Sequence, residues 1–138
     1  MSRLSGVREG RDMMARGYGG ILLSAAVLAA AAPASAQDAS AGAIVFKRCA
    51  ICHATDPGKG PKIGPSMGQI VGRKAGAMPG FIYSPAMTKS KITWTAEKLD
   101  AFVKQPSALV PGNKMAFGGI PDAKQRTDLI AFLKTLSN

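Results

Sequence analysis

The sequence predicts an all-α fold in which three main helices are joined by long loops. Three stretches carry apolar residues at the spacing of an amphipathic helix, whereas no stretch alternates apolar and polar residues over the length of a strand. About forty residues between the first and second stretches, 53–92, show hardly any periodicity. So long a loop is unusual in a compact domain, and we expect it to become ordered around a bound group.

The first two helices are expected at residues 38–50 (DASAGAIVFKRCA) and residues 95–105 (TAEKLDAFVKQ). In the first helix, Gly42 and Phe46 share one face. The second helix has one apolar face and ends at Pro106, because proline cannot continue a helix. That face consists of Leu99, Phe102 and Val103.

The third helix is expected at residues 122–136 (DAKQRTDLIAFLKTL). Asp122 suits the N-cap position, and with Gln125 it resembles a capping box. An apolar stripe along this helix predicts a buried face. The stripe consists of Leu129, Phe132, Leu133 and Leu136.

A cleavable secretory signal peptide is predicted at residues 1–36. Four arginines precede an apolar run at residues 21–32, and Ala34 and Ala36 flank Ser35 as at a small-x-small cleavage site. The run is shorter than the roughly 20 apolar residues that a membrane-spanning helix needs. We expect export with cleavage after Ala36. The alternative is an uncleaved anchor that also includes the GYGG segment before the run.

One domain, residues 37–138, would remain after cleavage. The cut removes 36 of 138 residues, with four of 18 basic and two of 8 acidic residues, and leaves 102 residues with a formal charge of +8. Such a surface favours acidic partners, and nucleic acid is the least expected partner of an exported protein. So short a chain has difficulty building a large core alone, and a disulfide between Cys49 and Cys52 would close only a small loop. The core is therefore expected to need a bound group.

Both cysteines and the single histidine of the chain lie in the segment CAICH, residues 49–53. Cys-x-x-Cys-His is the attachment signature of c-type haem. Cys49 and Cys52 would bind the porphyrin edge, and His53 would ligate the iron from the proximal side. A thioredoxin-like site would need a βαβ pattern, which is missing from the sequence, and a structural zinc site would need further Cys or His ligands. The motif therefore predicts one haem c per chain.

Methionine is the natural candidate for a second protein ligand to the iron, since the chain has no second histidine. His/Met ligation raises the reduction potential and suits electron transfer. Met115 is favoured because it lies in VPGNKMAFGG, bracketed by glycine-containing turns, and far enough from His53 in sequence to reach the opposite face of the haem. Met87 remains the alternative. The candidates after Ala36 are Met67, Met78, Met87 and Met115.

Several longer segments resemble class I cytochrome c, the mitochondrial protein and its bacterial periplasmic relatives. They are CAICH, KIGPSMG, VGRKAGAMPGFIYS, ITWTAEKLDAFVKQP, VPGNKMAFGGI and RTDLIAFLK, within residues 41–138. The resemblance implies the class I cytochrome c fold, with three main helices and long loops wrapped around one covalently attached haem. It also implies Met115 as the distal ligand, opposite His53.

The resemblance assigns supporting roles to further residues. The carbonyl of Pro65 would accept the free N–H of His53 and so fix the tautomer of the ring. Phe117 would cover the haem edge beside the distal ligand. The positions that hydrogen-bond or screen the haem propionates are Arg73, Tyr83 and Trp94. The positions of a tight crossing between the first and last helices are Gly42 and Phe132.

Some residues depart from the usual family pattern. Phe102 stands where a tyrosine is usual and Met87 where an asparagine is usual, so the haem pocket is expected to be drier and less polar. Met67 replaces a leucine, and Pro61 replaces a histidine common in the loop. Several lysines that ring the haem edge of the mitochondrial protein are replaced here by Ser107, Pro121 and Asp122. The basic residues retained at that edge are Arg48, Lys62 and Lys114.

The expected function is that of a soluble, monomeric, periplasmic one-electron carrier and not of an enzyme. By resemblance, electrons would pass from a quinol:cytochrome c reductase to a terminal oxidase, a peroxidase or a photosynthetic reaction centre, which would dock at the basic haem edge (Arg48, Lys62, Lys114). The alternative is a haem protein with a labile Met115 ligand that binds gases or reacts with peroxide. A membrane-surface role is less favoured, because no amphipathic helix with a strongly basic face is predicted.

Overall fold

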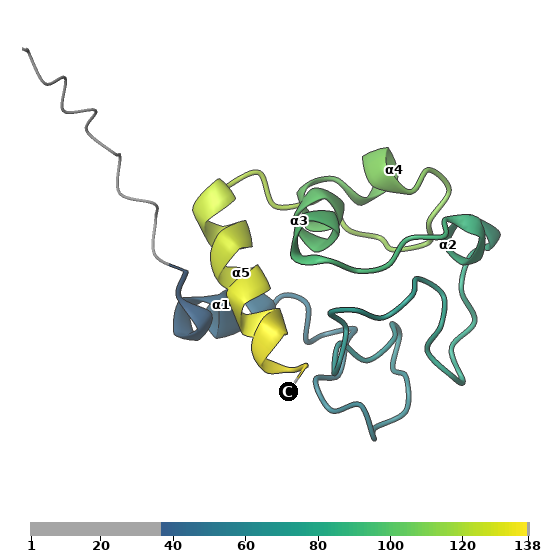
Figure 1. Ribbon diagram of the computed structural model, residues 1–138, viewed down its shortest axis with the longest axis horizontal. Coiled ribbons are helices and arrows are strands. Elements are labelled where there is room, and N and C mark those ends of the chain that lie inside the picture. Colours follow the sequence, from purple (N-terminus) through teal and green to yellow (C-terminus); the bar gives the residue numbers. More distant parts are fainter. Residues whose placement is uncertain (1–36, 138) are drawn as a thin grey trace, which may run out of the picture. The chain divides into compact units, whose positions relative to one another are not determined.

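Five helices and the loops between them make up residues 37–137, the part of the chain that this computed structural model describes (Figure 1). The helices are α1 (Ala39–Phe46), α2 (Pro85–Lys89), α3 (Ala96–Lys104), α4 (Pro106–Leu109) and α5 (Ala123–Thr135). Within these residues the β-type pairing is limited to one isolated bridge between Lys74 and Thr93. The all-α prediction is therefore confirmed. The signal peptide expected at residues 1–36 lies outside the described residues and stays a prediction.

The three predicted helices begin at capping residues. The carboxylate of Asp38 accepts hydrogen bonds from the N–H groups of Ser40 and Ala41, at 2.8 and 3.1 Å. Thr95 caps α3 and Asp122 caps α5 in the same way. These side chains satisfy N–H groups in the first helical turn that have no partner inside the helix.

Two short helices add to the three that the sequence predicts. α2 begins at Pro85, and the hydroxyl of Ser84 accepts a hydrogen bond from the Met87 N–H at 3.1 Å. α3 ends before Pro106, as expected, but this proline then begins α4 after the extended residue Gln105. Both helices are too short for an apolar period to reveal them.

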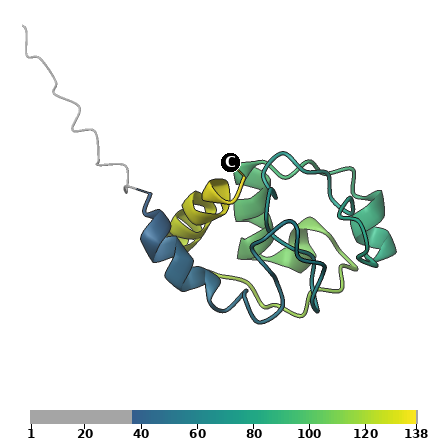
Figure 2. The same ribbon diagram turned by 90° about the horizontal axis from the view of Figure 1, so that it is seen from below.

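Helices α1 and α5 cross at close range and lie side by side in both views (Figure 1, Figure 2). A Cβ atom added to Gly42 would overlap the carbonyl group of Asp128 and lie 2.8 Å from the Cβ of Phe132. The ring centroids of Phe46 and Phe132 are 5.2 Å apart. Only glycine leaves enough room at position 42, as the resemblance implied.

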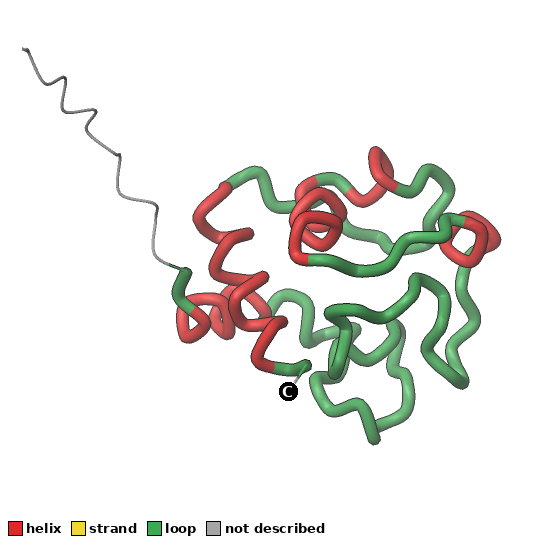
Figure 3. Tube along the Cα trace, in the orientation of Figure 1, coloured by secondary structure: helices red, strands yellow, loops and turns green. Residues whose placement is uncertain are grey.

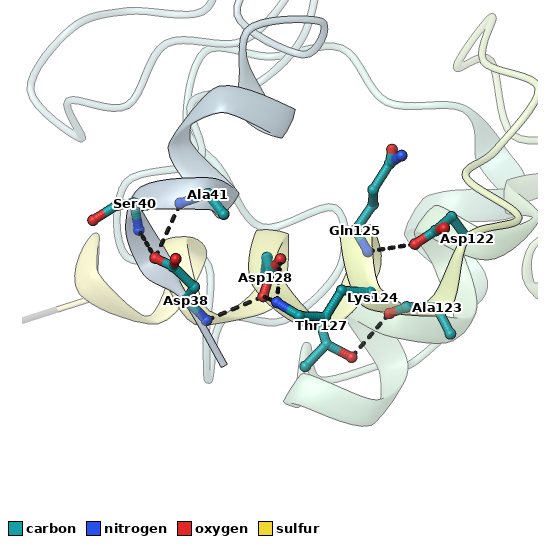
Figure 4. A network of polar contacts seen from close by, with 9 residues as sticks. All are labelled: Asp38, Ser40, Ala41, Asp122, Ala123, Lys124, Gln125, Thr127 and Asp128. Atoms are coloured by element: carbon teal, nitrogen blue, oxygen red, sulfur yellow. Dashed lines mark hydrogen bonds and ion pairs between the residues drawn. The ribbon is translucent and has the colours of Figure 1, made fainter. Parts of the chain in front are cut away.

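A polar network ties the start of α1 to the middle of α5 (Figure 4). The buried carboxylate of Asp128 accepts hydrogen bonds from the backbone N–H of Asp38 at 3.0 Å and from the Lys124 ammonium at 2.6 Å. The bond from Lys124 is the main reason why the pKa of Asp128 is lowered. The carboxylate therefore remains ionised well below neutral pH and holds the two helices together.

Gln125 completes only half of the expected capping box. Its N–H donates to the Asp122 carboxylate at 2.7 Å, as predicted. Its side-chain carbonyl accepts a hydrogen bond from the Arg48 guanidinium at 3.1 Å, so it is directed to the residue next to the cysteine motif. This bond links the turn after α1 to α5, in addition to the network at the start of α1.

Arg126 connects α5 to α3 and to the segment that precedes α5. Its guanidinium is buried and forms an ion pair with Asp100, with Nε 2.9 Å from the carboxylate. It also donates to the carbonyl groups of Ile120 and Pro121, at 3.0 and 2.7 Å. These bonds satisfy a charge that would be costly to bury alone. They also fix the chain just after the Met115 loop.

The long segment between α1 and α2 is almost entirely loop (Figure 3). It is held by local hydrogen bonds, and the fully buried Ser66 lies at their centre. The Ser66 hydroxyl donates to the Asp56 carbonyl at 2.8 Å and accepts from the Gly68 N–H at 3.2 Å.

Among residues 37–137, no helix combines the length and apolarity that crossing a membrane requires.

Candidate functional site

The Cys-x-x-Cys-His segment continues directly from α1 as a series of turns. The Cys49 N–H donates to the Phe46 carbonyl at 2.7 Å, and the N–H groups of Cys52 and His53 both donate to the Cys49 carbonyl, at 3.0 and 2.9 Å. Both cysteines are free thiols and are half-buried. Helix α1 thus ends earlier than the sequence pattern predicts, and the motif lies on the turn after it.

The imidazole of His53 is oriented by the backbone of Pro65. Nδ1 of His53 lies 2.7 Å from the Pro65 carbonyl oxygen. Because a carbonyl oxygen can only accept, Nδ1 carries the proton and Nε2 keeps a lone pair that can bind a metal. Burial lowers the pKa of His53, and the bond to Pro65 offsets this effect only in part. The ring is therefore mainly neutral at pH 7, the form that ligates metals.

Gly64 leaves the space that the His53 ring occupies. A Cβ atom at this position would overlap Cε1 of His53 and lie 2.7 Å from its Nδ1. The Gly64 N–H also donates to the Cys52 carbonyl at 2.9 Å. The loop that orients the histidine is therefore bonded directly to the cysteine segment.

Burial raises the pKa of the Cys49 thiol, and the neighbouring Arg48 offsets this effect only in part. Cysteines of thiol–disulfide enzymes show the opposite behaviour, because their reactivity depends on a lowered pKa. Cys49 thus has the character of a protonated, half-buried thiol. The thiol-redox interpretation of the motif is correspondingly weakened.

Met115 lies in the loop between α4 and α5, whose two ends are anchored by the buried residues Val110 and Ile120. The Met115 N–H donates to Oδ1 of Asn113 at 3.0 Å, and Nδ2 of Asn113 donates to the Val110 carbonyl at 2.8 Å. The Phe117 N–H donates to the Met115 carbonyl at 2.9 Å. A single amide side chain therefore bridges the loop and fixes the backbone of Met115.

Most of the apolar candidate residues pack against one hydrophobic core. Trp94 and Phe102 are buried in it, with their ring centroids 5.0 Å apart, and Met87 is buried in the same core. The candidate residues that are partly buried against the same core are Cys49, Met67, Tyr83, Met115 and Phe117. The fold thus brings the cysteine segment and the Met115 loop to a common apolar region. The dry environment expected from Phe102 and Met87 agrees with their burial.

Arg73 donates to loop carbonyls. Its guanidinium donates to the carbonyl of Ser66 at 2.7 Å and to that of Gly68 at 3.1 Å. It lies close enough to Tyr83 for the two groups to influence each other, and burial raises the pKa of the Tyr83 hydroxyl. The ring of Tyr83 meets Phe81 edge-on, with centroids 4.7 Å apart. Arg73 thus has a structural role in the loop, and its role toward the haem propionates remains a prediction.

The three predicted docking residues are exposed. Lys62 donates through Nζ to the Ala50 carbonyl at 3.3 Å, so it lies against the cysteine segment. Arg48 precedes that segment and bonds to Gln125. Lys114 lies on the Met115 loop. Positive charge therefore borders both segments that carry the candidate iron ligands.

The roles of three residues of the site, Gly64, Ser66 and Asn113, are not predicted from the sequence. Gly64 and Ser66 lie within a quoted motif, but the contacts that define them are made across the loop and leave no local pattern. Asn113 could have been recognised, since asparagine in a Pro-Gly-Asn turn commonly bonds to the nearby backbone. Its position two residues before Met115 indicates that it can hold the backbone of that methionine.

The donor groups fit a covalently attached haem better than a metal ion held by side chains alone. In the described part of the chain, no three His, Cys, Asp or Glu side chains gather where they could hold a metal. A neutral imidazole with a free Nε2 lies instead next to two free thiols. A porphyrin would supply the equatorial ligands that the side chains lack.

Comparisons with known proteins agree with this site. The family model described as cytochrome c matches residues 39–137. The chain is 44% identical to cytochrome c2 of Blastochloris viridis over 117 residues, which cover 85% of this chain and 89% of the relative. It is also 44% identical to cytochrome c2 of Rhodomicrobium vannielii over 114 residues, which cover 83% of this chain and 91% of the relative.

A solved structure shares the fold. Cytochrome cH from Methylobacterium extorquens superimposes with a TM-score of 0.67 at 40% sequence identity, and the match covers 71% of this chain and 98% of that one. The match therefore covers about as much of this chain as the structure describes.

Proposed function

The chain belongs to the cytochrome c family, and from this premise we propose that it is a one-electron carrier in which His53 and Met115 are the axial ligands of the iron. The family implies a covalently attached haem c, and Cys49 and Cys52 stand at the spacing that attachment requires. The bound haem supplies the reversible Fe(III)/Fe(II) couple. The observation that carries the proposal is the 2.7 Å bond between Nδ1 of His53 and the Pro65 carbonyl, which leaves Nε2 free to bind a metal.

The choice of Met115 as the second ligand is supported by how its loop is built. The Asn113 amide holds the Met115 backbone, and Val110 and Ile120 anchor the loop at both ends. Met87 is buried within the core and lies on α2. A ligand carried on a preformed loop needs less reorganisation when the oxidation state of the iron changes, which favours fast electron exchange.

The protein residues set the environment of the redox centre. The Pro65 carbonyl raises the basicity of His53 as a ligand. Phe102, Met87 and Trp94 are buried in the hydrophobic core, and we infer that they line the haem pocket and exclude water from it. A pocket of low polarity disfavours the form of the iron with the greater charge, and so tends to raise the reduction potential. We also propose that the haem propionates are hydrogen-bonded or screened by Arg73, Tyr83 and Trp94. Phe117 would cover the haem edge.

The proposed partners are membrane redox complexes with acidic docking sites. A quinol:cytochrome c reductase would donate electrons, and a terminal oxidase or photosynthetic reaction centre would accept them. The exposed basic residues Arg48, Lys62 and Lys114 would steer brief encounters whose rate falls with salt. We propose a monomer that acts in the periplasm after cleavage behind Ala36, because a diffusing carrier needs one exposed haem edge and no stable interface.

An optical spectrum of the protein made with haem-attachment machinery tests this function. We expect a weak band in the red for the ferric protein, which arises from iron–thioether bonding, and its loss in a Met115→Ala variant. A Met87→Ala variant is the matched control and should keep the band. Rapid and complete binding of carbon monoxide by the reduced wild-type protein at neutral pH would contradict the carrier and support the gas-binding alternative.

A further inference from the structure

A single peptide group, the one that joins Pro65 to Ser66, is hydrogen-bonded at both of its polar ends. Its carbonyl oxygen, on Pro65, accepts from Nδ1 of His53 at 2.7 Å. Its N–H, on Ser66, donates to Sδ of Met78 at 2.9 Å. The thioether of Met78 is therefore linked to the proposed iron ligand through one peptide group.

The Met78 sulfur satisfies an N–H group that lies inside the protein. Ser66 is fully buried, and among residues 37–137 its N–H forms no hydrogen bond other than the one to this sulfur. A buried N–H that loses its partner is costly, because water does not replace the lost bond. Met78 is buried as well. We therefore expect this N–H to depend on the thioether and not on solvent.

The other polar atoms of Ser66 are bonded elsewhere in the loop. The hydroxyl donates to the Asp56 carbonyl at 2.8 Å, and the carbonyl accepts from the Arg73 guanidinium at 2.7 Å. These bonds fix the position of Ser66 but do not touch the peptide group that precedes it. The orientation of that peptide group is left to its two partners, the His53 imidazole and the Met78 thioether.

We propose that Met78 is a positioning residue for His53 and acts through this peptide group. A hydrogen bond at the N–H of a peptide polarises it and makes its carbonyl a stronger acceptor. The Pro65 carbonyl then attracts the Nδ1 proton more strongly, and the imidazole becomes a more basic ligand. Because a more basic ligand favours the ferric iron, the thioether lowers the reduction potential. The inference rests on the proposed electron-carrier function and names a residue that adjusts its potential.

Two substitutions at position 78 separate the hydrogen bond from the packing. Met78→Leu conserves the apolar volume but removes the acceptor. Met78→Gln conserves the reach of the side chain and offers a carbonyl oxygen, which accepts more strongly than a thioether. Ile130→Leu, a similarly conservative change at a buried position on α5, is the matched control.

Three properties of each holoprotein are measured. The first is the reduction potential. The second and third are the hydrogen-exchange rates of the Ser66 amide and of the His53 Nδ1 proton, followed by NMR in the reduced protein. The exchange rates report on the two hydrogen bonds directly, whereas the potential reports on the iron.

We expect both protons to exchange about tenfold faster in Met78→Leu than in the wild type, as the loss of one hydrogen bond would give. The ratio of reduced to oxidised protein at a fixed solution potential should rise about threefold, which is about 30 mV for a one-electron couple. Met78→Gln should retain slow exchange and a potential at or below that of the wild type. Ile130→Leu should stay within about twofold of the wild type in each rate and in that ratio.

A wild-type potential in Met78→Leu would overturn the inference even if the Ser66 amide exchanged faster, because Met78 would then hold only the loop. The same shift of potential in Met78→Leu and Met78→Gln, or in Ile130→Leu, would also overturn it, since packing and not the acceptor would be the cause. A wild-type holoprotein without the red ferric band would contradict the proposed function instead. Exchange of the Ser66 amide in the two Met78 variants would still test the bond to sulfur in that case.

Discussion

The side chain of Asn113 accepts a hydrogen bond from the Met115 N–H at 3.0 Å and donates one to the Val110 carbonyl at 2.8 Å. These two bonds span the turn between the anchored end of the loop and its methionine. A short amide side chain thus transmits the rigidity of the core to the proposed distal ligand.

Replacing Asn113 should loosen that ligand. Asn113→Ala removes both bonds, which are typically worth about 1 kcal/mol each. We expect imidazole to displace the thioether from the ferric iron at a concentration about tenfold lower than in the wild type. The measurement is the loss of the red ferric band during an imidazole titration.

The Asn113→Asp variant separates the two bonds. Aspartate keeps an oxygen for the Met115 N–H but has no group to donate to Val110 when ionised. It should therefore fall between the wild type and Asn113→Ala. An alanine variant that resists imidazole as well as the wild type would show that the bridge does not hold the ligand.

A methyl group at Gly42 should weaken the α1–α5 crossing. The added Cβ overlaps the Asp128 carbonyl and lies 2.8 Å from the Cβ of Phe132, so the helices must separate. We expect Gly42→Ala to lower the free energy of unfolding by about 1–3 kcal/mol in urea titrations. Gly60→Ala is the matched control, since nothing lies within 4 Å of a Cβ at that position. Equal stability of the two variants would rule out a tight crossing.

A substitution at Gly64 should disturb the proximal side without a comparable effect on the helices. A Cβ there overlaps the His53 ring, so the imidazole must tilt away from the Pro65 carbonyl. We expect Gly64→Ala to alter the electronic spectrum of the ferric protein and to lower the reduction potential or the yield of attached haem. Gly60→Ala, which adds a methyl group with no protein atom within 4 Å, is the comparison. Unchanged spectra, potential and yield in Gly64→Ala would argue against this contact.

Asp128 should contribute to stability in a pH-dependent way. The Lys124 ammonium, assisted by the Asp38 N–H, lowers its pKa in the folded protein. A carboxyl whose folded pKa lies below its unfolded value, about 4, stabilises the fold above that value. This stabilisation is lost as the pH falls through the folded pKa. We expect Asp128→Asn to melt at a lower temperature than the wild type at pH 6–7. This difference in melting temperature should shrink toward pH 2–3.

Lys124→Met provides the complementary test of the same network. It removes the ammonium but leaves the Asp38 N–H, so the folded pKa of Asp128 is lowered less, and the acid-induced loss of stability should be smaller and should end at a higher pH than in the wild type. Melting curves of the wild type and both variants between pH 2 and 7 make the comparison. Parallel curves for all three proteins would exclude Asp128 as a source of the acid sensitivity.

The main helices and the haem motif could be predicted from the sequence because their signals are local. Asp38, Thr95 and Asp122 stand directly before apolar periods, and all three cap helices in the structure. The Cys-x-x-Cys-His motif is contiguous. The short helices α2 and α4 have no such period, and their prolines signal a break as readily as a beginning.

Contacts between distant segments could not be derived from residue patterns. The need for glycine at position 42 depends on the approach of Asp128 and Phe132, so only the resemblance predicts it. The resemblance predicts that Arg73 contacts the propionates, but no residue pattern predicts the bonds that its guanidinium donates to the carbonyls of Ser66 and Gly68. Sequence gives the type of side chain, but the acceptor depends on how the loop folds back.

The α1–α5 crossing also has a consequence for the timing of folding. During synthesis, α1 and the adjoining cysteines emerge long before α5, so Gly42 has no surface to pack against until nearly the whole chain has been made. We therefore expect Cys49 and Cys52 to remain on an open chain during that interval, with both thiols accessible. Completion of α5 then closes the ends of the domain together. The close approach at Gly42 is thus expected to delay the partial burial of both thiols until the chain is nearly complete.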